Sequence, residues 1–229
     1  MVAEGALMSV WQWFTDPANW TGPDGIPVRT AQHLMISFVA MAIAMVIALP
    51  IGLILGHQGK GEVFAVNVGN VGRAIPTFGL LIIFASTTLI GVGDWAAILA
   101  LAIFAIPPLL TNTFTGLRQV TPQSVDAAAG MGMSGAQVLT KVEVPQAMPI
   151  IAAGVRTAAV QVVATASLAA FVGGGGLGTY VINGFATADT TLIIAGSILI
   201  AAISLLAELV LSQIQKAATP KGLREREPS

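Results

Sequence analysis

A polar stretch between two apolar ones organises this sequence: TGLRQVTPQSVDAAAGMGMSGAQVLTKVEVPQAMP, residues 115–149. It is too polar to cross a bilayer, which needs about 20 mostly apolar residues per helix. Thr121-Pro122 predicts a helix start, because threonine caps a helix and proline fits its first position. Gly130 and Gly132 predict a break, and Ser134 predicts a second start. We therefore expect a helix, a glycine turn and a second helix between two membrane spans.

Composition sets the class of protein around this stretch. Of 229 residues, 55% are hydrophobic and only 9% are charged, whereas a soluble domain carries about 25% charged residues. The formal net charge is −1, which gives nucleic acid no basic face to bind. There are no cysteines, and His33 and His57 lack metal-ligand spacing, so we expect no metal site.

Apolar segments long enough to span a membrane predict an all-α integral membrane protein of about five transmembrane helices. Their expected ranges are 30–55, 75–92, 95–114, 150–172 and 190–214. The apolar stretch 63–71 is too short to span and is expected to be an interfacial or re-entrant helix. The aromatic residues of 11–14 are expected to anchor the chain at the membrane interface.

The basic residues predict the orientation, because cytoplasmic loops carry an excess of lysine and arginine. One set of loops holds eight of the ten: Lys60, Arg73, Arg118, Lys141, Lys216, Lys221, Arg224 and Arg226. The opposite set holds Arg29 and also all four tryptophans and Tyr180, an aromatic belt. We expect the N-terminus outside and the C-terminus in the cytoplasm.

This orientation predicts a domain plan for the whole chain. Residues 1–29 form an external interfacial segment, 30–214 a transmembrane permease domain and 215–229 a charged cytoplasmic tail. Within the transmembrane domain, 115–149 is a cytoplasmic loop and 173–189 an external glycine-rich loop.

The polar stretch resembles the coupling segment of importer-type ABC permeases. The matching residues are Asp126-Ala127-Ala128, Gly132 and Val142-Glu143-Val144-Pro145. Asp126 stands where glutamate is usual, and valines stand where isoleucine and leucine are usual. The resemblance implies a coupling helix that docks in a groove of an ATP-hydrolysing subunit. The docking residues it implies are Asp126, Ala127, Ala128, Gly130, Met131, Gly132 and Pro145. The alternative is a structural helical hairpin with an accidental match.

Most of the chain also resembles the permeases for osmoprotectant uptake, which import glycine betaine, choline, carnitine or proline betaine. The segments that carry this resemblance are 33–56, 75–81, 108–116, 130–133, 153–159 and 173–178. It implies a type I ABC importer permease subunit in a prokaryotic plasma membrane, itself no enzyme. The implied partners are two ATP-binding subunits that hold ATP and Mg, a second permease chain and an external solute-binding protein.

Two other transporter classes remain as alternatives. Methionine-type or other amino-acid ABC permeases share the five spans and the glycine run, but fit 112–116 less well. An ion-coupled secondary carrier usually needs ionisable groups inside the membrane, and only Arg156 and Glu208 lie within the expected spans, free to pair or to extend toward the interface. The chain has no phosphate-binding loop with a lysine at the required spacing, so we expect it to bind no cofactor itself.

The glycine run 173–178 formally matches a dinucleotide fingerprint, but an apolar span precedes it and no acidic residue follows at the required distance. It is either a flexible external loop or an irregular turn at the external mouth of a pathway. The candidate gate residues are Gly173, Gly174, Gly175, Gly176 and Gly178.

Polar residues within the expected spans are candidates to line the pathway: Asn112, Gln161, Thr165 and Ser167. Serine and threonine often bond within or between helices instead, so Gln161 is the strongest candidate because lipid would leave its amide unpaired. Gly52 and Gly56 have the G-x-x-x-G spacing that favours close helix packing. With few aromatic residues in the spans to cage an ammonium group, selectivity is expected to reside in the external binding protein.

Overall fold

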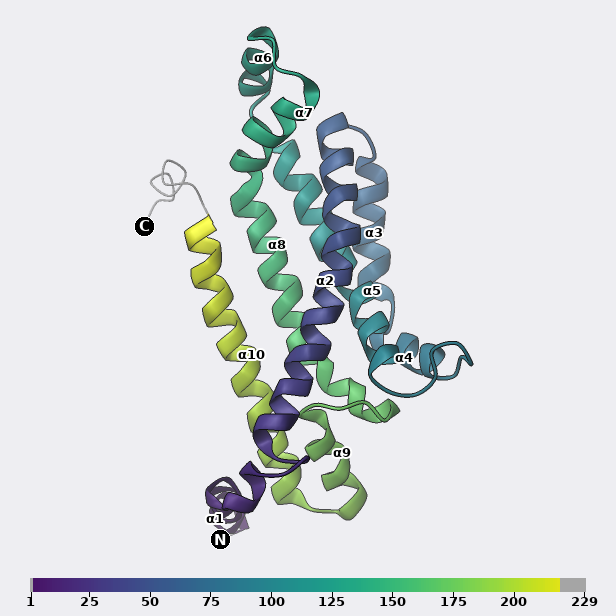
Figure 1. The fold of residues 1–229 in the computed structure, drawn as a ribbon, viewed down its shortest axis with the longest axis vertical. Helices are drawn as coiled ribbons and strands as arrows, with labels where there is room; N and C mark the ends of the chain where they lie inside the picture. Colours follow the sequence, from purple (N-terminus) through teal and green to yellow (C-terminus); the bar gives the residue numbers. More distant parts are fainter. Residues whose placement is uncertain (1, 219–229) are drawn as a thin grey trace. The chain divides into compact units, whose positions relative to one another are not determined.

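The computed structural model describes residues 2–218, and all regular structure in that part of the chain is helical (Figure 1). The longer helices are α1 (Val2–Thr15), α2 (Ile26–Gln58), α3 (Glu62–Ala74), α4 (Thr77–Ala85), α5 (Asp94–Arg118), α6 (Pro122–Gly130), α8 (Val144–Thr165), α9 (Gly178–Thr187) and α10 (Thr190–Ala218). The short ones are η1 (Pro17–Trp20), α7 (Gly135–Val138), the π-helix η2 (Leu139–Glu143) and the 3-10 helix η3 (Ala166–Val172). The expected tail residues 219–229 lie outside the described part.

Four helical stretches are long and apolar enough to cross a membrane: α2, α5, residues 135–172 and α10. A fifth span arises if the helices Glu62–Gly72 and Thr77–Ala85, bent by 80° at their junction, are taken together as one broken span. The prediction of an all-α protein with about five spans is therefore confirmed.

The expected second span, 75–92, is wrong in detail. Helix α4 has nine residues, which at 1.5 Å per residue reach less than half of the roughly 30 Å hydrocarbon core. The chain then leaves the helix through turns, in which Gly91 and Gly93 have φ values of 69° and 119°. The short apolar stretch 63–71 does form a helix, α3, which precedes the bend.

The described chain divides into two compact units, each made of three segments. Unit 1 comprises Met1–Ala42, Ile75–Phe104 and Val160–Ala207, and unit 2 comprises Ile43–Ala74, Ala105–Ala159 and Glu208–Ser229. Helices α2, α5, α8 and α10 each contribute residues to both units.

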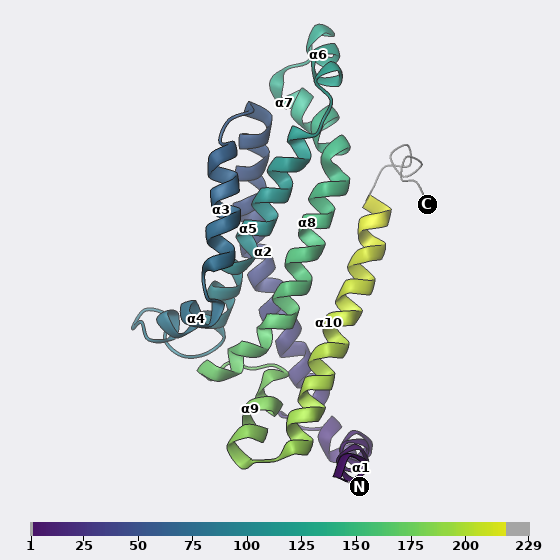
Figure 2. The same ribbon diagram turned by 180° about the vertical axis from the view of Figure 1, so that it is seen from behind.

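Close helix contacts build unit 2. A Cβ atom added at Gly52 or Gly56 would lie 2.8 Å from the Cβ of Thr113 or of Leu117, respectively, so the predicted close packing at these glycines is confirmed. Gly154 of α8 faces Asn112, whose Cβ would be 2.5 Å away from an added Cβ. Helix α3 lies along the second half of α5 in both Figure 1 and Figure 2, where the Thr111 hydroxyl donates to the carbonyl of Ala65.

Aromatic residues of the N-terminal segment pack into unit 1. Its core joins Ile26, Leu177 and Tyr180. The ring of Trp13 makes edge-to-face contacts with Phe14 at 5.2 Å and with Tyr180 at 5.3 Å, a favourable arrangement for aromatic pairs. The segment that precedes α2 is therefore tied to α9 by packing.

Candidate functional site

The polar stretch of unit 2 folds as a helix, a glycine turn and a second helix, as predicted. Thr121 precedes α6 with Pro122 at its first position, although the Thr121 hydroxyl pairs with Ser124 Oγ at 2.8 Å instead of capping the backbone. Gly130 is still helical, and the chain reverses at Gly132, whose φ of 82° suits glycine. Helix α6 thus ends at Gly130 and the chain turns at Gly132, in agreement with the break expected at these two glycines.

The second helix begins with a reciprocal cap. The Ser134 N–H donates to Gln137 Oε1 at 2.8 Å, and the Gln137 N–H donates to Ser134 Oγ at 3.4 Å. This capping box satisfies two backbone donors at the helix start. It fixes the point at which the chain leaves the glycine turn.

Most of the expected docking residues lie on the surface of this element. Asp126, Ala127, Gly130 and Gly132 are exposed, and the apolar side chain of Met131 is 73% exposed. Ala128 is only 2% exposed, so the expectation that it offers its side chain to a partner is corrected: its side chain is buried within the chain.

Pro145 follows an irregular turn. Proline lacks an N–H and clashes with the carbonyl four residues earlier in an α-helix. The π-helix Leu139–Glu143 lies immediately before it, and the Val144 N–H bonds to the carbonyl of Leu139, five residues back. The helix therefore continues through Pro145, which is half-buried, instead of presenting it on the surface with Asp126.

A buried carboxylate connects this turn to the end of α2. His57, in the last turn of α2, places Nδ1 2.5 Å from Oε2 of Glu143, whose side chain is 7% exposed. From the sequence, His57 was considered only as a metal ligand, for which it lacks the spacing. No spacing rule relates it to Glu143, which lies 86 positions away.

The glycine run of unit 1 is an ordered irregular turn. Gly173 ends η3 in the left-handed conformation with a φ of 74°, and Gly176 has a φ of 98°. The Gly175 N–H donates to Asp94 Oδ1 at 2.7 Å, and the Gly176 N–H donates to Gln32 Oε1 at 3.2 Å. Of the two alternatives, this geometry favours an irregular turn over a slack loop. The expected loop 173–189 also contains helix α9, which the sequence analysis missed.

Close neighbours explain why side chains are missing from this turn. An added Cβ would lie 2.9 Å from the Ala169 carbonyl oxygen at Gly174 and 2.6 Å from Gln32 Oε1 at Gly175, and at Gly178 it would overlap the Ser167 carbonyl. Real Cβ atoms are not found this close to backbone atoms. Gly174 and Gly178 therefore require glycine for space, because their close neighbours are backbone atoms, whereas at Gly175 the neighbour is the end of the flexible Gln32 side chain. Gly173 and Gly176 require glycine for their positive φ.

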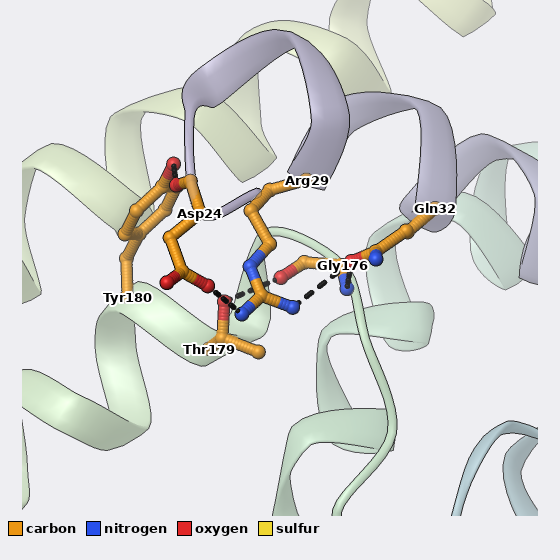
Figure 3. A network of polar contacts seen from close by, with 6 residues as sticks. All are labelled: Asp24, Arg29, Gln32, Gly176, Thr179 and Tyr180. Atoms are coloured by element: carbon orange, nitrogen blue, oxygen red, sulfur yellow. Dashed lines mark hydrogen bonds and ion pairs between the residues drawn. The ribbon is translucent and has the colours of Figure 1, made fainter. Parts of the chain in front are cut away.

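A polar network ties the start of α2 to the glycine turn (Figure 3). The Arg29 guanidinium pairs with the carboxylate of Asp24 and donates to Gln32 Oε1 at 2.9 Å. Gln32 Oε1 thus accepts from both Arg29 and the Gly176 N–H, and the Thr179 hydroxyl donates to the Gly176 carbonyl at 2.7 Å.

Tyr180 adds a second link to the same loop. Its hydroxyl donates to the Asp24 carbonyl at 2.6 Å. Burial raises the pKa of Tyr180, the positive charge of Arg29 lowers it and the negative charge of Asp24 raises it, with burial dominant. The phenol therefore keeps the proton that it donates.

The candidate pathway residues occupy different environments. In unit 2, the Asn112 amide donates to the Pro108 carbonyl of its own helix at 2.8 Å. In unit 1, the Ser167 hydroxyl donates to the Ala164 carbonyl at 3.2 Å, Thr165 is half-buried and Gln161 is exposed. Ser167 lines a mostly apolar cleft of about 470 Å³ together with Phe171, Gly178 and Ser204. The polar groups of Asn112 and Ser167 are thus satisfied locally.

The two ionisable groups within the spans form a pair in unit 2. Arg156 Nε of α8 lies 3.4 Å from Glu208 Oε1 of α10, with the side chains 33% and 39% exposed. Of the alternatives considered for these residues, pairing is the one observed.

This helical fold is shared with membrane chains of solved ABC transporters. The chain folds like a chain of the MetNI methionine ABC transporter, with a TM-score of 0.73 and 23% identity over 85% of this chain and 97% of that one. It also resembles a chain of an amino acid ABC transporter, with a TM-score of 0.63 and 19% identity over 84% of this chain and 91% of that one. These distant likenesses describe the fold alone.

The chain belongs to the family of binding-protein-dependent transport system inner membrane components, which matches residues 48–221. It is therefore a multi-pass membrane component of a transport system and not an enzyme. It is 35% identical to the glycine betaine/carnitine/choline transport system permease protein OpuCB of Bacillus subtilis, over 86% of this chain and 89% of the relative. It is 37% identical to the carnitine transport permease protein OpuCB of Listeria monocytogenes, over 86% and 90%. The osmoprotectant import permease protein OsmW of Salmonella typhimurium is 32% identical, over 85% and 92%.

Proposed function

We propose that this chain is the permease subunit of an ATP-driven importer for a compatible solute: glycine betaine, choline, carnitine or proline betaine. The similarity to osmoprotectant permeases over most of the chain carries this proposal. The exposed surface of α6 and its glycine turn supports it, since an ATP-driven permease needs a surface on which a separate ATPase can act.

In the proposed mechanism, ATP and Mg bind to two partner ATPase subunits, which close and shift α6. The spans of this chain and of a second permease chain then alternate between outward-facing and inward-facing states. The external binding protein releases its solute into the outward-facing pathway, and hydrolysis resets the cycle. The proposed docking surface comprises Asp126, Ala127, Gly130, Met131 and Gly132, all of which are exposed.

The charges of the two units support the proposed orientation. Unit 2 contains nine of the ten lysine and arginine positions, whereas unit 1 contains Arg29, the four tryptophans and Tyr180. Basic residues favour the cytoplasmic side, and tryptophan and tyrosine favour an interface. We assign residues 1–29 to the external side and the tail 215–229 to the cytoplasmic side.

The glycine turn and the polar residues of the spans are proposed as parts of the pathway. Gly173, Gly174, Gly175, Gly176 and Gly178 would form the external gate. Gln161, exposed on α8, is the foremost candidate for lining, with Thr165, Ser167 and Asn112 as further candidates.

Uptake of radiolabelled glycine betaine, choline and methionine in cells with and without this chain tests the proposal. We expect chain-dependent uptake of betaine or choline that stops when ATP is depleted, and an ATPase that co-purifies with the tagged chain. Uptake of methionine alone would favour the amino-acid permease alternative. Transport that persists without ATP but collapses with ionophores would indicate a secondary carrier.

A further inference from the structure

A polar cleft of about 560 Å³ opens in unit 1 beside the glycine turn. Its walls come from the start of α2, the start of α5, the glycine turn and α9: Arg29, Gln32, Gly93, Asp94, Ala170, Gly173, Gly174, Gly175, Thr179 and Asn183. Its volume falls within the range of small-molecule sites, about 300–1,000 Å³. The docking surface does not account for it, and of the pathway candidates only the gate glycines Gly173, Gly174 and Gly175 line it.

Arg29 brings one positive charge to this cleft with unused bonding capacity. Two of its nitrogens bond to Asp24 and Gln32 (Figure 3), while Nε is buried without a hydrogen-bond partner among the described residues. Nε is buried and so not accessible from the cleft, but each of the two terminal nitrogens carries a second N–H beyond its bond to Gln32 or Asp24. A guanidinium also matches a carboxylate through paired N–H groups, so an incoming carboxylate could share Arg29 with Asp24.

Asp94 brings one negative charge to the same cleft. It is exposed, and its Oδ1 accepts the N–H of Gly175. The Thr179 and Asn183 side chains add neutral polar groups to the wall. The cleft thus combines one cation and one anion with few apolar side chains.

We propose that this cleft is a receiving site on the permease for a zwitterionic solute, which binds its carboxylate at Arg29 and its cationic group at Asp94. The inference rests on the proposed function, because it takes the solute to be of the betaine class. It gives the permease a selectivity of its own, separate from that of the binding protein. Choline, which has no carboxylate, uses Asp94 alone.

Three substitutions test the roles of Arg29 and Asp94 separately. Each is expected to change the affinities for glycine betaine and choline differently. Arg29→Gln removes the cation and should weaken glycine betaine binding about tenfold or more, the loss expected for a hydrogen bond to a charged group, with choline within about twofold. Asp94→Asn keeps an oxygen for the Gly175 N–H but loses the charge, so it should weaken both solutes about tenfold. Asp24→Asn keeps the backbone carbonyl that Tyr180 uses and removes the competitor for Arg29, so it should strengthen betaine binding alone.

Equilibrium binding of radiolabelled glycine betaine and choline to the complete importer in lipid nanodiscs, without the external binding protein, measures these effects. Asp16→Asn is the matched control: it removes a carboxylate of the same unit that caps η1 outside the cleft and keeps the acceptor for the Ala18 N–H. Retained choline binding shows that Arg29→Gln has folded. A gain of affinity in Asp24→Asn cannot arise from misfolding.

The inference is overturned if the wild-type importer binds neither solute, if Arg29→Gln weakens both equally, or if Asp24→Asn leaves betaine binding unchanged. Cellular uptake separates this failure from that of the proposed function. If the wild-type chain supports no uptake of either solute, the proposed function fails. If uptake is normal but the variants do not discriminate between the solutes, only the receiving site fails.

Discussion

His57 and Glu143 join the end of α2 to the π-helical turn that follows the proposed docking surface, through a 2.5 Å contact between imidazole and carboxylate. Both residues belong to unit 2. The Glu143 side chain is almost fully buried, so the imidazole is what compensates its removal from water. Under the proposed mechanism, this contact fixes the position of the π-helical turn from which the proposed docking surface extends.

Replacing His57 with alanine should destabilise the protein by about 1–3 kcal/mol, because it leaves a buried carboxylate without its partner. Thermal unfolding of the purified chain in detergent checks this expectation. His57→Ala combined with Glu143→Gln should recover part of the loss, since no buried charge then remains. A double variant no more stable than His57→Ala would show that the unpaired Glu143 carboxylate is not the cause of the lost stability.

Changes on the exposed face of α6 should uncouple the permease from its ATPase. Asp126→Lys reverses an exposed charge, and Met131→Asp puts a charge on the exposed apolar side chain. We expect either change to reduce uptake at least tenfold, about 1.4 kcal/mol of lost association, with normal amounts of the chain in the membrane. Co-purification of the ATPase measures the cause directly.

Glu62→Lys is the control for these variants, because it reverses another exposed charge of unit 2, at the start of α3. It should leave ATPase co-purification unchanged. Equal loss in the control would point to a general charge effect on unit 2 instead of a docking surface at α6.

The glycine turn should not tolerate side chains at its centre. Gly175→Val would place a Cβ 2.6 Å from Gln32 Oε1, displace that amide and so break the hydrogen bond that the Gly176 N–H donates to it. We expect uptake to be lost while the chain remains in the membrane, as judged by immunoblots of membrane fractions. Gly91→Ala separates steric from conformational effects: its φ of 69° strains any side chain, whereas an added Cβ would meet nothing within 4 Å. Normal uptake by Gly175→Val would refute the gate.

The Arg156–Glu208 pair should behave as one unit in a double-mutant cycle. An unpaired charge inside a membrane costs about 3 kcal/mol on insertion scales, reduced here because both side chains are a third or more exposed. Arg156→Gln and Glu208→Gln should each lower the melting temperature in detergent, and the double variant should lose less than the sum. Additive losses would mean that the two charges act independently.

The ends of the long helices were largely predictable from sequence, whereas the bends were not. Helices α2, α5 and α10 contain the expected ranges because long apolar runs leave few alternatives. The second span failed because 75–92 is apolar enough to span, and hydropathy does not register the turns at Gly91 and Gly93. Helix α9 was missed because the glycine run before it indicates a loop, and the short amphipathic segment that follows was assigned to the same loop.

The candidate sites were predictable to the degree that they depend on local sequence. Thr121 and Ser134, as caps, and the glycines between them, through their backbone conformation, predict the helix, the turn and the second helix. The bonds from Asp94 and Gln32 to the glycine turn span 81 and 144 positions. They depend on which helix ends meet in space, and one sequence without this contact information does not reveal them. The burial of Ala128 likewise depends on which face of α6 packs inward, and local sequence does not determine that face.

The helical stretch from Gly135 to Val172 is continuous over 38 residues. Helix α6, with the proposed docking surface, precedes it, the glycine turn follows it, and the π-helical turn lies close to its start. A π-turn holds one residue more than an α-turn, and each residue corresponds to about 100° of helical rotation. If the π-turn shifts along the helix, the residues between its old and new positions rotate about the helix axis, and the helix stays continuous. A small displacement at one end of this stretch is therefore converted into a rotation of the helix about its own axis.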